Sequence, residues 1–248
     1  MALYDFSATR LFVRQPLDSG AVIACDRDQA NYLVNVMRLA DGARLHVFDG
    51  VNGEWRARLE RIAKKAVQLV AEEQVRPQTD PGDLWLVFAP LKQARLDYMV
   101  QKAVEMGASR LVPVTTRYTQ VGRLNLERIE ANAVEAAEQC GILSVITCDD
   151  LKPLPAVLAA LPDDRLLVFC DEDAAVANPA AAMQPFAVAP PPLAVLIGPE
   201  GGFSPEERAM IIKRPRSIAL SLGPRILRAD TAAVAALAVV QAALGDWR

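Results

Sequence analysis

The strongest constraint on the fold is an alternation of apolar strands and amphipathic helices that fills the last two thirds of the chain. Residues 84–90 (LWLVFAP) are continuously apolar, which is typical of a strand buried on both faces. The next apolar residues recur at helical spacing from Leu96 to Val104, and the pattern ends at Gly107. Strands separated by helices form a mostly parallel sheet that is covered on both faces. We therefore predict an α/β domain over residues 84–248.

The same alternation continues to the end of this domain. The last predicted helix consists almost entirely of Ala, Val and Leu, so it must be buried in a core or in a subunit interface. Further strands are predicted at 110–114, 145–147, 165–170, 193–198 and 217–223, and helices at 126–140, at 154–161, from Ser204 onward and at 230–244.

The N-terminal part has a different pattern, in which short strands predominate. Trp55, Ala57 and Leu59 alternate with charged residues, as a half-buried strand requires. These strands indicate a small, mostly β, barrel-like domain over residues 1–74, followed by a linker at 75–83 that is rich in Pro, Gly and Asp. Its predicted strands are 10–13, 21–24, 44–50, 54–62 and 66–73, and one helix is predicted at 28–39.

The composition excludes several classes of protein. Among 248 residues, 27 Lys and Arg face 30 Asp and Glu, whereas indiscriminate nucleic-acid binding needs an excess of positive charge. No apolar run approaches the roughly 18 residues of a membrane span, and the N-terminus lacks an export signal, so we expect a cytoplasmic location. A local basic cluster exists, which we interpret as a solvated strand face: Arg56, Arg58, Arg61, Lys64 and Lys65.

Residues that commonly bind metal ions are few and scattered. Cys25, Cys140, Cys148 and Cys170 have no C-x-x-C spacing, and His46 is the single histidine. We therefore expect no metal site, and we interpret the cysteines as reduced, mostly buried thiols. Cysteine nucleophilic catalysis with a histidine base is poorly supported, because only His46 could serve as that base.

Residues 193–207 (LAVLIGPEGGFSPEE) form the first segment that points to a function. A buried strand ends at Gly198, a glycine-rich loop follows, and Ser204 and Glu207 have the spacing of a helix capping box. In open α/β sheets ligands bind at the carboxyl ends of strands, where glycines let the backbone approach a ligand closely. The loop is neither a Walker A motif nor a dinucleotide fingerprint. A tight turn that needs glycine would explain the same residues, so this loop alone does not identify a function.

Residues 221–237 (SLGPRILRADTAAVAAL) form the second segment. A strand ends at Gly223, and Arg228 and Asp230 stand at the start of the apolar helix, where unpaired charge would be costly. Asp230 could be the N-cap of that helix or a group in the chemistry, and both can hold together. Arg228 could pair with that cap or with Glu200.

Together, IGPEGGFSPEE and LGPRILRADTA resemble the paired C-terminal motifs of the bacterial 16S ribosomal RNA uridine N3-methyltransferases, a SPOUT family. Two further segments, 89–108 (APLKQARLDYMVQKAVEMGA) and 136–141 (AAEQCG), are similar to that family's sequence after the domain linker and in mid-domain. RLFV and the later HVFDG are similar to its N-terminal PUA-like barrel. The resemblance thus spans nearly the whole chain.

The resemblance implies a SPOUT α/β domain with a deep trefoil knot, a small PUA-like β-barrel domain before it, and a homodimer. It implies S-adenosylmethionine as the cofactor and a uridine of 16S ribosomal RNA in the small ribosomal subunit as the substrate. Arg228 and Thr231 would lie near the methionine end of the cofactor and the incoming base. The residues implied to contact the cofactor are Ile197, Gly198, Glu200, Gly201, Leu220, Leu222, Gly223, Ile226, Leu227 and Thr231.

Methylation of uracil N3 requires that the proton on N3 be removed. We expect Asp230, or a water that it holds, to accept this proton, while Arg228 stabilises the negative charge that develops on the neighbouring carbonyl oxygens. The target base must be unpaired or flipped out of a stack to be reached. The N-terminal domain would grip the surrounding RNA backbone through four candidates, Arg10, Arg14, Arg56 and Arg58.

Two positions depart from the family pattern. Ile142 follows the mid-domain Cys-Gly, where the family usually has Arg, and Asp230 stands where Glu is common. Both changes bear on the RNA substrate more than on the cofactor. Three alternatives stay open: a SPOUT methyltransferase for another RNA position, an inactive RNA-binding or ribosome-assembly protein, and a nucleotide-dependent oxidoreductase, which the absent dinucleotide fingerprint disfavours.

Overall fold

The chain divides by its internal contacts into two compact units. The computed structural model describes residues 8–63, 66–171, 174 and 178–247. The smaller unit contains the chain up to Asp80 together with Ala137–Val145, and the larger contains Pro81–Ala136 and the chain from Ile146 onward. It stays a prediction that residues 1–74 and residues 84–248 form two domains joined by a linker.

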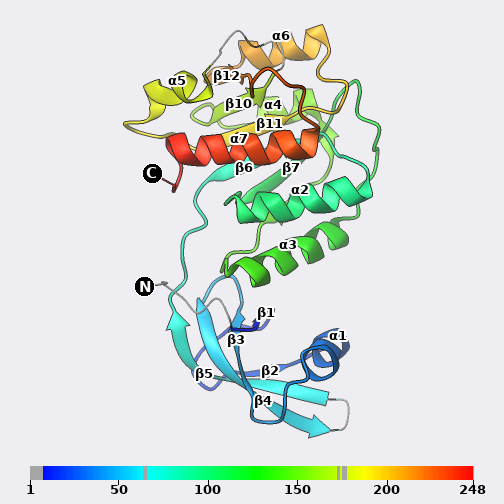
Figure 1. Cartoon of the computed structure of the whole chain (residues 1–248), viewed down its shortest axis with the longest axis vertical. Helices are drawn as coiled ribbons and strands as arrows, with labels where there is room; N and C mark the ends of the chain where they lie inside the picture. The colour runs from blue at the N-terminus through cyan, green and yellow to red at the C-terminus, as the bar shows by residue number, and fades with distance from the viewer. Residues whose placement is uncertain (1–7, 64–65, 172–173, 175–177, 248) are drawn as a thin grey trace. The chain divides into compact units, whose positions relative to one another are not determined.

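A five-stranded sheet forms the smaller unit, in the order β1-β3-β4-β5-β2 (Figure 1). β1 pairs with β3 in parallel, and the other neighbours are antiparallel. The five strands predicted from the sequence are confirmed. They are β1 (Arg10–Phe12), β2 (Val22–Ala24), β3 (Arg44–Phe48), β4 (Glu54–Ala63) and β5 (Ala66–Arg76).

The predicted alternation in β4 is confirmed. Ala57 and Leu59 are fully buried, whereas Arg56 and Arg58 are partly exposed. The sheet therefore presents one apolar face, as period-2 alternation dictates. That face belongs to a core which also contains Leu33 from the helical segment of this unit.

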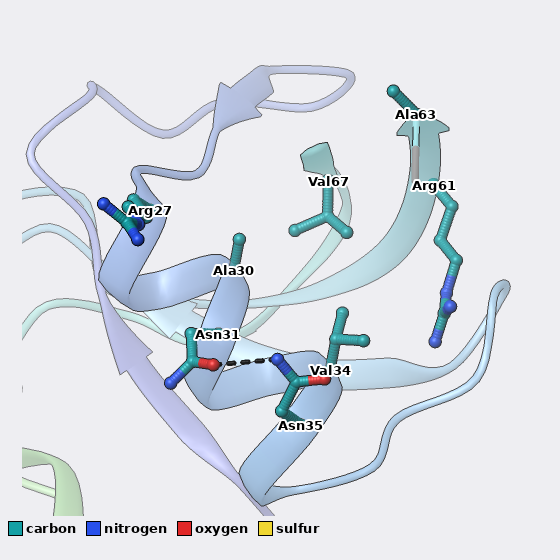
Figure 2. Close-up of a pocket in the computed structure, with 8 residues that line it drawn as sticks. All are labelled: Arg27, Ala30, Asn31, Val34, Asn35, Arg61, Ala63 and Val67. Atoms are coloured by element: carbon teal, nitrogen blue, oxygen red, sulfur yellow. Dashed lines mark hydrogen bonds between the residues drawn. The ribbon is translucent and has the colours of Figure 1, made fainter. Parts of the chain in front are cut away.

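The helix predicted at 28–39 is shorter than expected and has two parts. α1 (Arg27–Asn31) is an α-helix, and η1 (Tyr32–Val36) continues it as a π-helix (Figure 2). Arg38 has a φ of 55°, in the left-handed region where a right-handed helix cannot continue. Hydrophobic spacing alone could not reveal this change of backbone hand, so the predicted C-terminal end of the helix was wrong.

A parallel sheet forms the centre of the larger unit, in the order β12-β10-β11-β6-β7-β8, and β9 also pairs with β7. Every one of these pairings is parallel. The sequence pattern did not predict β9, because two residues carry no periodicity. The strands are β6 (Leu84–Phe88), β7 (Arg110–Thr115), β8 (Thr147–Cys148), β9 (Lys152–Pro153), β10 (Leu166–Cys170), β11 (Leu193–Ile197) and β12 (Ser217–Leu220).

Helical layers cover both faces of this sheet (Figure 1). In β11, Ala194 and Leu196 join a core with α4 and α6, while Val195 and Ile197 point to the opposite face and are equally buried. α7 packs along α2 and contacts β11. The helices are α2 (Gln93–Glu105), α3 (Leu126–Cys140), α4 (Leu154–Ala160), α5 (Pro179–Met183), α6 (Pro205–Lys213) and α7 (Ala229–Leu244), with a 3-10 turn η2 (Gln184–Phe186).

The predicted fold class, a small β unit beside an α/β unit with a parallel sheet, is confirmed. The trefoil knot that the resemblance implies stays a prediction. None of the helices in the described part of the chain has the length and hydropathy that a transmembrane span requires.

Candidate functional site at the carboxyl edge of the parallel sheet

The two predicted loops leave the parallel sheet at the same edge. β10 lies between β11 and β12, and β6 lies on the other side of β11. Because these strands are parallel, the chain after Ile197, after Leu220 and after Phe88 emerges at one common edge. The two glycine-containing loops therefore leave the sheet on the same side, with β10 between their strands.

Close packing explains the glycines of the loop between β11 and α6. A Cβ added to Gly198 would lie 3.0 Å from the Phe203 ring, and one added to Gly201 would lie 3.1 Å from Cβ of Tyr118. Gly202 has a φ of 68°, which side chains disfavour. This loop thus has a fixed path that larger residues would disturb, whatever it binds.

The predicted capping box at the start of α6 is confirmed. The backbone N–H of Glu207 donates to Ser204 Oγ at 3.2 Å, and the backbone N–H of Ser204 donates to Glu207 Oε2 at 2.9 Å. Glu207 also accepts from the backbone N–H of Arg117 at 2.8 Å. These bonds fix the far end of the glycine loop to the helix that follows it.

The loop between β12 and α7 exposes apolar surface. Leu220 is buried, Leu222 and Leu227 are half-buried, and Gly223 has a φ of 100° with open space around its Cα. The side chain of Ile226 is 89% exposed. This loop thus holds backbone groups and apolar side chains at the surface rather than in its own core.

Arg95 joins the two loops. Its Nε and Nη2 each donate to a carboxylate oxygen of Asp230, both at 3.0 Å, in a bidentate pair. Its Nη1 donates to Glu200 of the glycine loop. One guanidinium from the first turn of α2 therefore holds one carboxylate from each loop.

The Arg95 pair also determines the charge state of Asp230. Hydrogen bonds from Arg95 lower the pKa of the Asp230 carboxyl; partial burial opposes this, and the backbone N–H of Thr231, which donates at 3.0 Å, adds to the lowering. Asp230 is consequently an ionised acceptor at neutral pH, and it is a weaker base than an ordinary carboxylate.

The structural roles predicted for Asp230 and Arg228 at the start of α7 are corrected. Arg228, and not Asp230, occupies the N-cap position, and it makes no side-chain capping bond. Asp230 lies in the first turn, where its negative charge interacts favourably with the helix dipole. The partner of Asp230 and Glu200 is Arg95 rather than Arg228, whose exposed side chain has no hydrogen bond or ion pair with any residue that the structure describes.

Sequence reasoning missed Arg95, although a signal for it existed. Arg95 follows β6 by a few residues, and β6 ends at the same sheet edge as the two loops. The rule that ligand sites gather at the carboxyl ends of parallel strands would have pointed to this segment. The sequence did not reveal that β6 and β11 are neighbours, and so it did not place Arg95 beside Glu200.

Two other predicted site residues, Ile197 and Thr231, differ in burial. Ile197 is buried at the end of β11, and Thr231 is exposed in the first turn of α7. That these residues, with the glycines and leucines of both loops, contact a cofactor stays a prediction.

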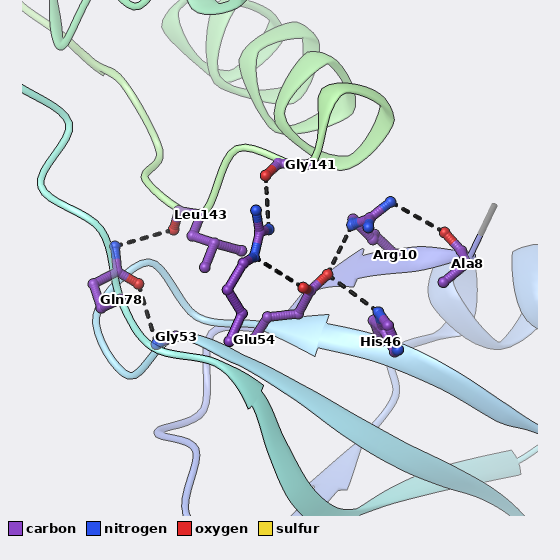
Figure 3. Close-up of polar contacts among 9 residues, drawn as sticks. Ala8, Arg10, His46, Gly53, Glu54, Gln78, Gly141 and Leu143 are labelled. Atoms are coloured by element: carbon purple, nitrogen blue, oxygen red, sulfur yellow. Dashed lines mark hydrogen bonds and ion pairs between the residues drawn. The ribbon is translucent and has the colours of Figure 1, made fainter. Parts of the chain in front are cut away.

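In the smaller unit, Arg10 belongs to a buried polar network (Figure 3). Its Nε donates to Glu54 Oε1 at 2.7 Å, and Arg76 Nε donates to Glu54 Oε2 at 3.1 Å. His46 Nδ1 lies 3.3 Å from Glu54 Oε1. Burial opposes the ionisation of Glu54, but the hydrogen bond from His46 and the charges of Arg76 and Arg10 outweigh it and lower the pKa of that carboxyl.

The same network anchors the mid-domain segment to the N-terminal sheet. Arg76 Nη2 donates to the Gly141 carbonyl at 2.7 Å, and Leu143 is buried within this unit. Ile142, at the position where the resemblance leads one to expect Arg, is half-buried. Arg10 is only 4% exposed, so the interpretation of Arg10 as a contact for RNA is corrected: it is a structural ion-pair partner.

Two of the other arginines predicted to contact RNA are also paired with carboxylates. Arg56 pairs with Glu73. Arg58 pairs with Glu60 at 2.6 Å and with Glu72 at 3.2 Å. Their positive charge is therefore largely compensated on the sheet itself. The remaining candidate, Arg14, is exposed, with its guanidinium 5.9 Å from the centre of the Phe12 ring.

Cys25, Cys148 and Cys170 are thiols with raised pKa values. Burial, reinforced by neighbouring aspartates, raises the pKa of Cys25 to about 11 and those of Cys148 and Cys170 to about 12. Such thiols are protonated at neutral pH and are poor nucleophiles. Cys25, Cys148 and Cys170 are partly buried and Cys140 is exposed, so the expectation of mostly buried thiols is met only in part. Within the described residues, no group of three or more His, Cys, Asp or Glu is placed to hold a metal ion.

Comparisons with known proteins agree with this architecture. A family model described as an RNA methyltransferase domain matches residues 78–241, and a second, described as an RNA methyltransferase PUA domain, matches residues 25–72. A ribosomal RNA small subunit methyltransferase E of Synechocystis is 31% identical over 96% of this chain and 78% of its own length. This chain belongs to the ribosomal RNA small subunit methyltransferase E family.

Other relatives span the same length. The methyltransferase E of Rickettsia conorii is 27% identical, over 94% of both chains. A Legionella pneumophila protein, described as a methyltransferase in complex with the bound cofactor SAM, is 28% identical, with a TM-score of 0.83 over 95% of this chain and 98% of that one. The methyltransferase E of Neisseria gonorrhoeae, at 24% identity and a TM-score of 0.85, shares the fold.

Proposed function

We propose that this chain transfers a methyl group from S-adenosylmethionine to N3 of a uridine in the 16S ribosomal RNA of the small subunit. The observation that carries the proposal is the junction at Arg95, which holds a glycine loop and the start of α7 together at the ligand-binding edge of a parallel sheet. Membership of the methyltransferase E family supplies the reaction class. The SAM complex of the Legionella relative supports the choice of cofactor.

The residues at this edge fit the chemistry of the cofactor. Adenine is flat and largely apolar, and the exposed Ile226 with Leu222 and Leu227 offers apolar contacts to it. Gly223 leaves its backbone open to close approach, and the backbone at Gly198 and Gly201 would contact the ribose and adenine. The bound sulfonium supplies an electrophilic methyl carbon.

The chain's own side chains would handle the proton and the charge of the base. When N3 bonds to the methyl carbon, the S–CH3 bond breaks and the N3 proton must leave. We assign its removal to Asp230, acting through a water that it holds, because its lowered pKa makes direct protonation unfavourable. Arg228, exposed and without a carboxylate partner in the described chain, would stabilise the charge on the uracil carbonyl oxygens.

A homodimer would cover exposed apolar residues of the larger unit, such as Val188 and Ile212. The cytoplasm is where small-subunit RNA would be encountered. The target uridine would be unpaired or flipped when it reaches the loops. The N-terminal unit would bind the RNA around it.

The decisive experiment is methyl transfer in vitro. Purified protein, S-adenosylmethionine and unmethylated small-subunit RNA, either free or as assembled subunits, are incubated, and the modified nucleotide is mapped by mass spectrometry. A single 3-methyluridine supports the proposal, and methylation at another atom or base refutes its N3 assignment. Calorimetry with S-adenosylmethionine separates an inactive RNA-binding protein, which would release no binding heat, from an enzyme lacking the right RNA.

A further inference from the structure

A groove on the smaller unit, outside the site described above, combines apolar walls with two arginines. It has a volume of about 350 Å³ and lies between the helical segment and the ends of β4 and β5 (Figure 2). Buried Ala30 and Val67 and half-buried Val34 form its apolar part. The residues that line it are Arg27, Ala30, Asn31, Val34, Asn35, Arg61, Ala63 and Val67.

The charge of this groove distinguishes it from the arginine-bearing face of β4. Among the residues that the structure describes, neither Arg27 nor Arg61 forms a side-chain ion pair; Arg61 Nη2 donates to the Leu39 carbonyl at 3.1 Å. The nearby Asp26 and Asp41 carboxylates accept from backbone N–H groups. Two exposed guanidiniums therefore remain able to bind an anion. Lys64 and Lys65, grouped with Arg61 in the sequence, lie outside the described residues.

The two asparagines present an unused donor and acceptor side by side. Asn35 Nδ2 donates to Asn31 Oδ1 at 2.8 Å, which fixes both amides on one face of the helical segment. Asn31 Nδ2 and Asn35 Oδ1 then remain for a ligand. A donor next to an acceptor is what the Watson–Crick edge of a nucleobase requires. The π-helical geometry from Tyr32 to Val36, a type often found at functional sites, shapes this face.

We infer that this groove binds a nucleotide of single-stranded RNA within the substrate. The base lies on the apolar wall formed by Ala30, Val34 and Val67, the free amide groups bind its edge, and Arg27 and Arg61 bind the flanking phosphates. The inference rests on the proposed RNA substrate and deepens it, since it moves the RNA contact from Arg56 and Arg58 to this groove. A protein partner is disfavoured, because two exposed guanidiniums beside a narrow apolar wall match a phosphate–base–phosphate unit.

The test measures binding of unmodified small-subunit RNA to the full chain by filter binding over a range of salt concentrations. For single strands, each phosphate contact contributes a slope of about −0.7 in log K against log salt, equal to roughly fivefold in affinity at 0.1 M. R27A/R61A should therefore weaken binding by about 25-fold at 0.1 M salt and make the slope shallower by about 1.4. N31A/N35A should weaken binding without changing the slope, because it removes no charge.

Three controls make the result specific. R44A/R58A removes the same net charge from the same unit, but both arginines are paired with Glu72, so its effect on RNA affinity should be small. In methylation assays the groove variants should raise KM for RNA and leave kcat and the affinity for S-adenosylmethionine unchanged. Thermal unfolding of each variant verifies that it is folded.

Several outcomes would overturn the inference. The first is an equal loss of RNA affinity in R27A/R61A and R44A/R58A, and the second is wild-type RNA affinity in all groove variants. The third is a loss of binding to assembled subunits while binding to free RNA is unaffected, which would assign the groove to a ribosomal protein. Because RNA binding is measured without methyl transfer, failure of the proposed methylation would appear separately.

Discussion

Removal of the Arg95 guanidinium is the sharpest test of how the site is held together. R95A deletes two hydrogen bonds of 3.0 Å to Asp230 and the contact with Glu200. The Arg95 side chain is 28% exposed, that of Asp230 17% and that of Glu200 51%. Charge-assisted bonds contribute about 1.5–3 kcal/mol when buried and about 0–1 kcal/mol when exposed, so we expect a net loss of roughly 2 kcal/mol.

This loss should appear in stability or in catalysis. For a unit of this size, 2 kcal/mol corresponds to a decrease of about 4–8 °C in the melting temperature. If displaced loops instead stabilise the transition state less, by the same 2 kcal/mol, kcat/KM decreases by about 30-fold. R95K, which keeps the charge but cannot form the bidentate pair, should show a smaller loss in either case.

The pH dependence gives an independent check. Arg95 lowers the pKa of Asp230 in the folded state, so the stability from this pair is complete above the ordinary carboxyl value of 3.8 and is lost as the pH falls through the lowered value. Urea unfolding at pH 7 should separate the wild type from R95A, and the difference should shrink in acid. A difference that keeps its full pH 7 size as the pH falls well below 3.8, or R95A with wild-type stability and kcat/KM at pH 7, would refute the reasoning.

Three further substitutions test other parts of the molecule. R228A should reduce kcat by about 100-fold or more while calorimetry finds nearly unchanged S-adenosylmethionine affinity, since its side chain has no structural partner in the described chain; equal loss of both would make Arg228 structural. E54A removes the carboxylate that buried Arg10 and partly buried Arg76 share, so urea unfolding should show a loss of about 3–5 kcal/mol, and a loss below 1 kcal/mol would contradict this account of the network. S204A removes one capping bond of α6 and should cost about 1 kcal/mol in the same assay, whereas S204T should retain most of it.

Local patterns predicted most of the secondary structure because they depend on near neighbours. The alternation of Ala57 and Leu59 with arginines identified β4, and the spacing of Ser204 and Glu207 identified the start of α6. The helix after Asp26 was predicted too long, because the positive φ of Arg38 has no signature in hydrophobic spacing.

The candidate site was only partly accessible to the same reasoning. The two loops were identified from their glycines and from their place after apolar strands, and resemblance to a family assigned them a ligand. The role of Arg10 was predicted wrongly, because a sequence does not tell a buried arginine paired with Glu54 from an exposed one. The sequence also did not show that Glu60 and Glu72 compensate the positive charge of Arg58, since Glu72 lies on the neighbouring strand.

By itself, the sequence determined which segments become strands and helices and which loops carry glycine at strand ends, because these properties follow from side chains a few positions apart. Only the tertiary structure decided which charges meet. Arg95 and Asp230 are 135 residues apart, and they pair because parallel strands carry their segments to one edge of the sheet. The strength of an ion pair depends on the distance between its two charges and on their burial, and the local sequence specifies neither.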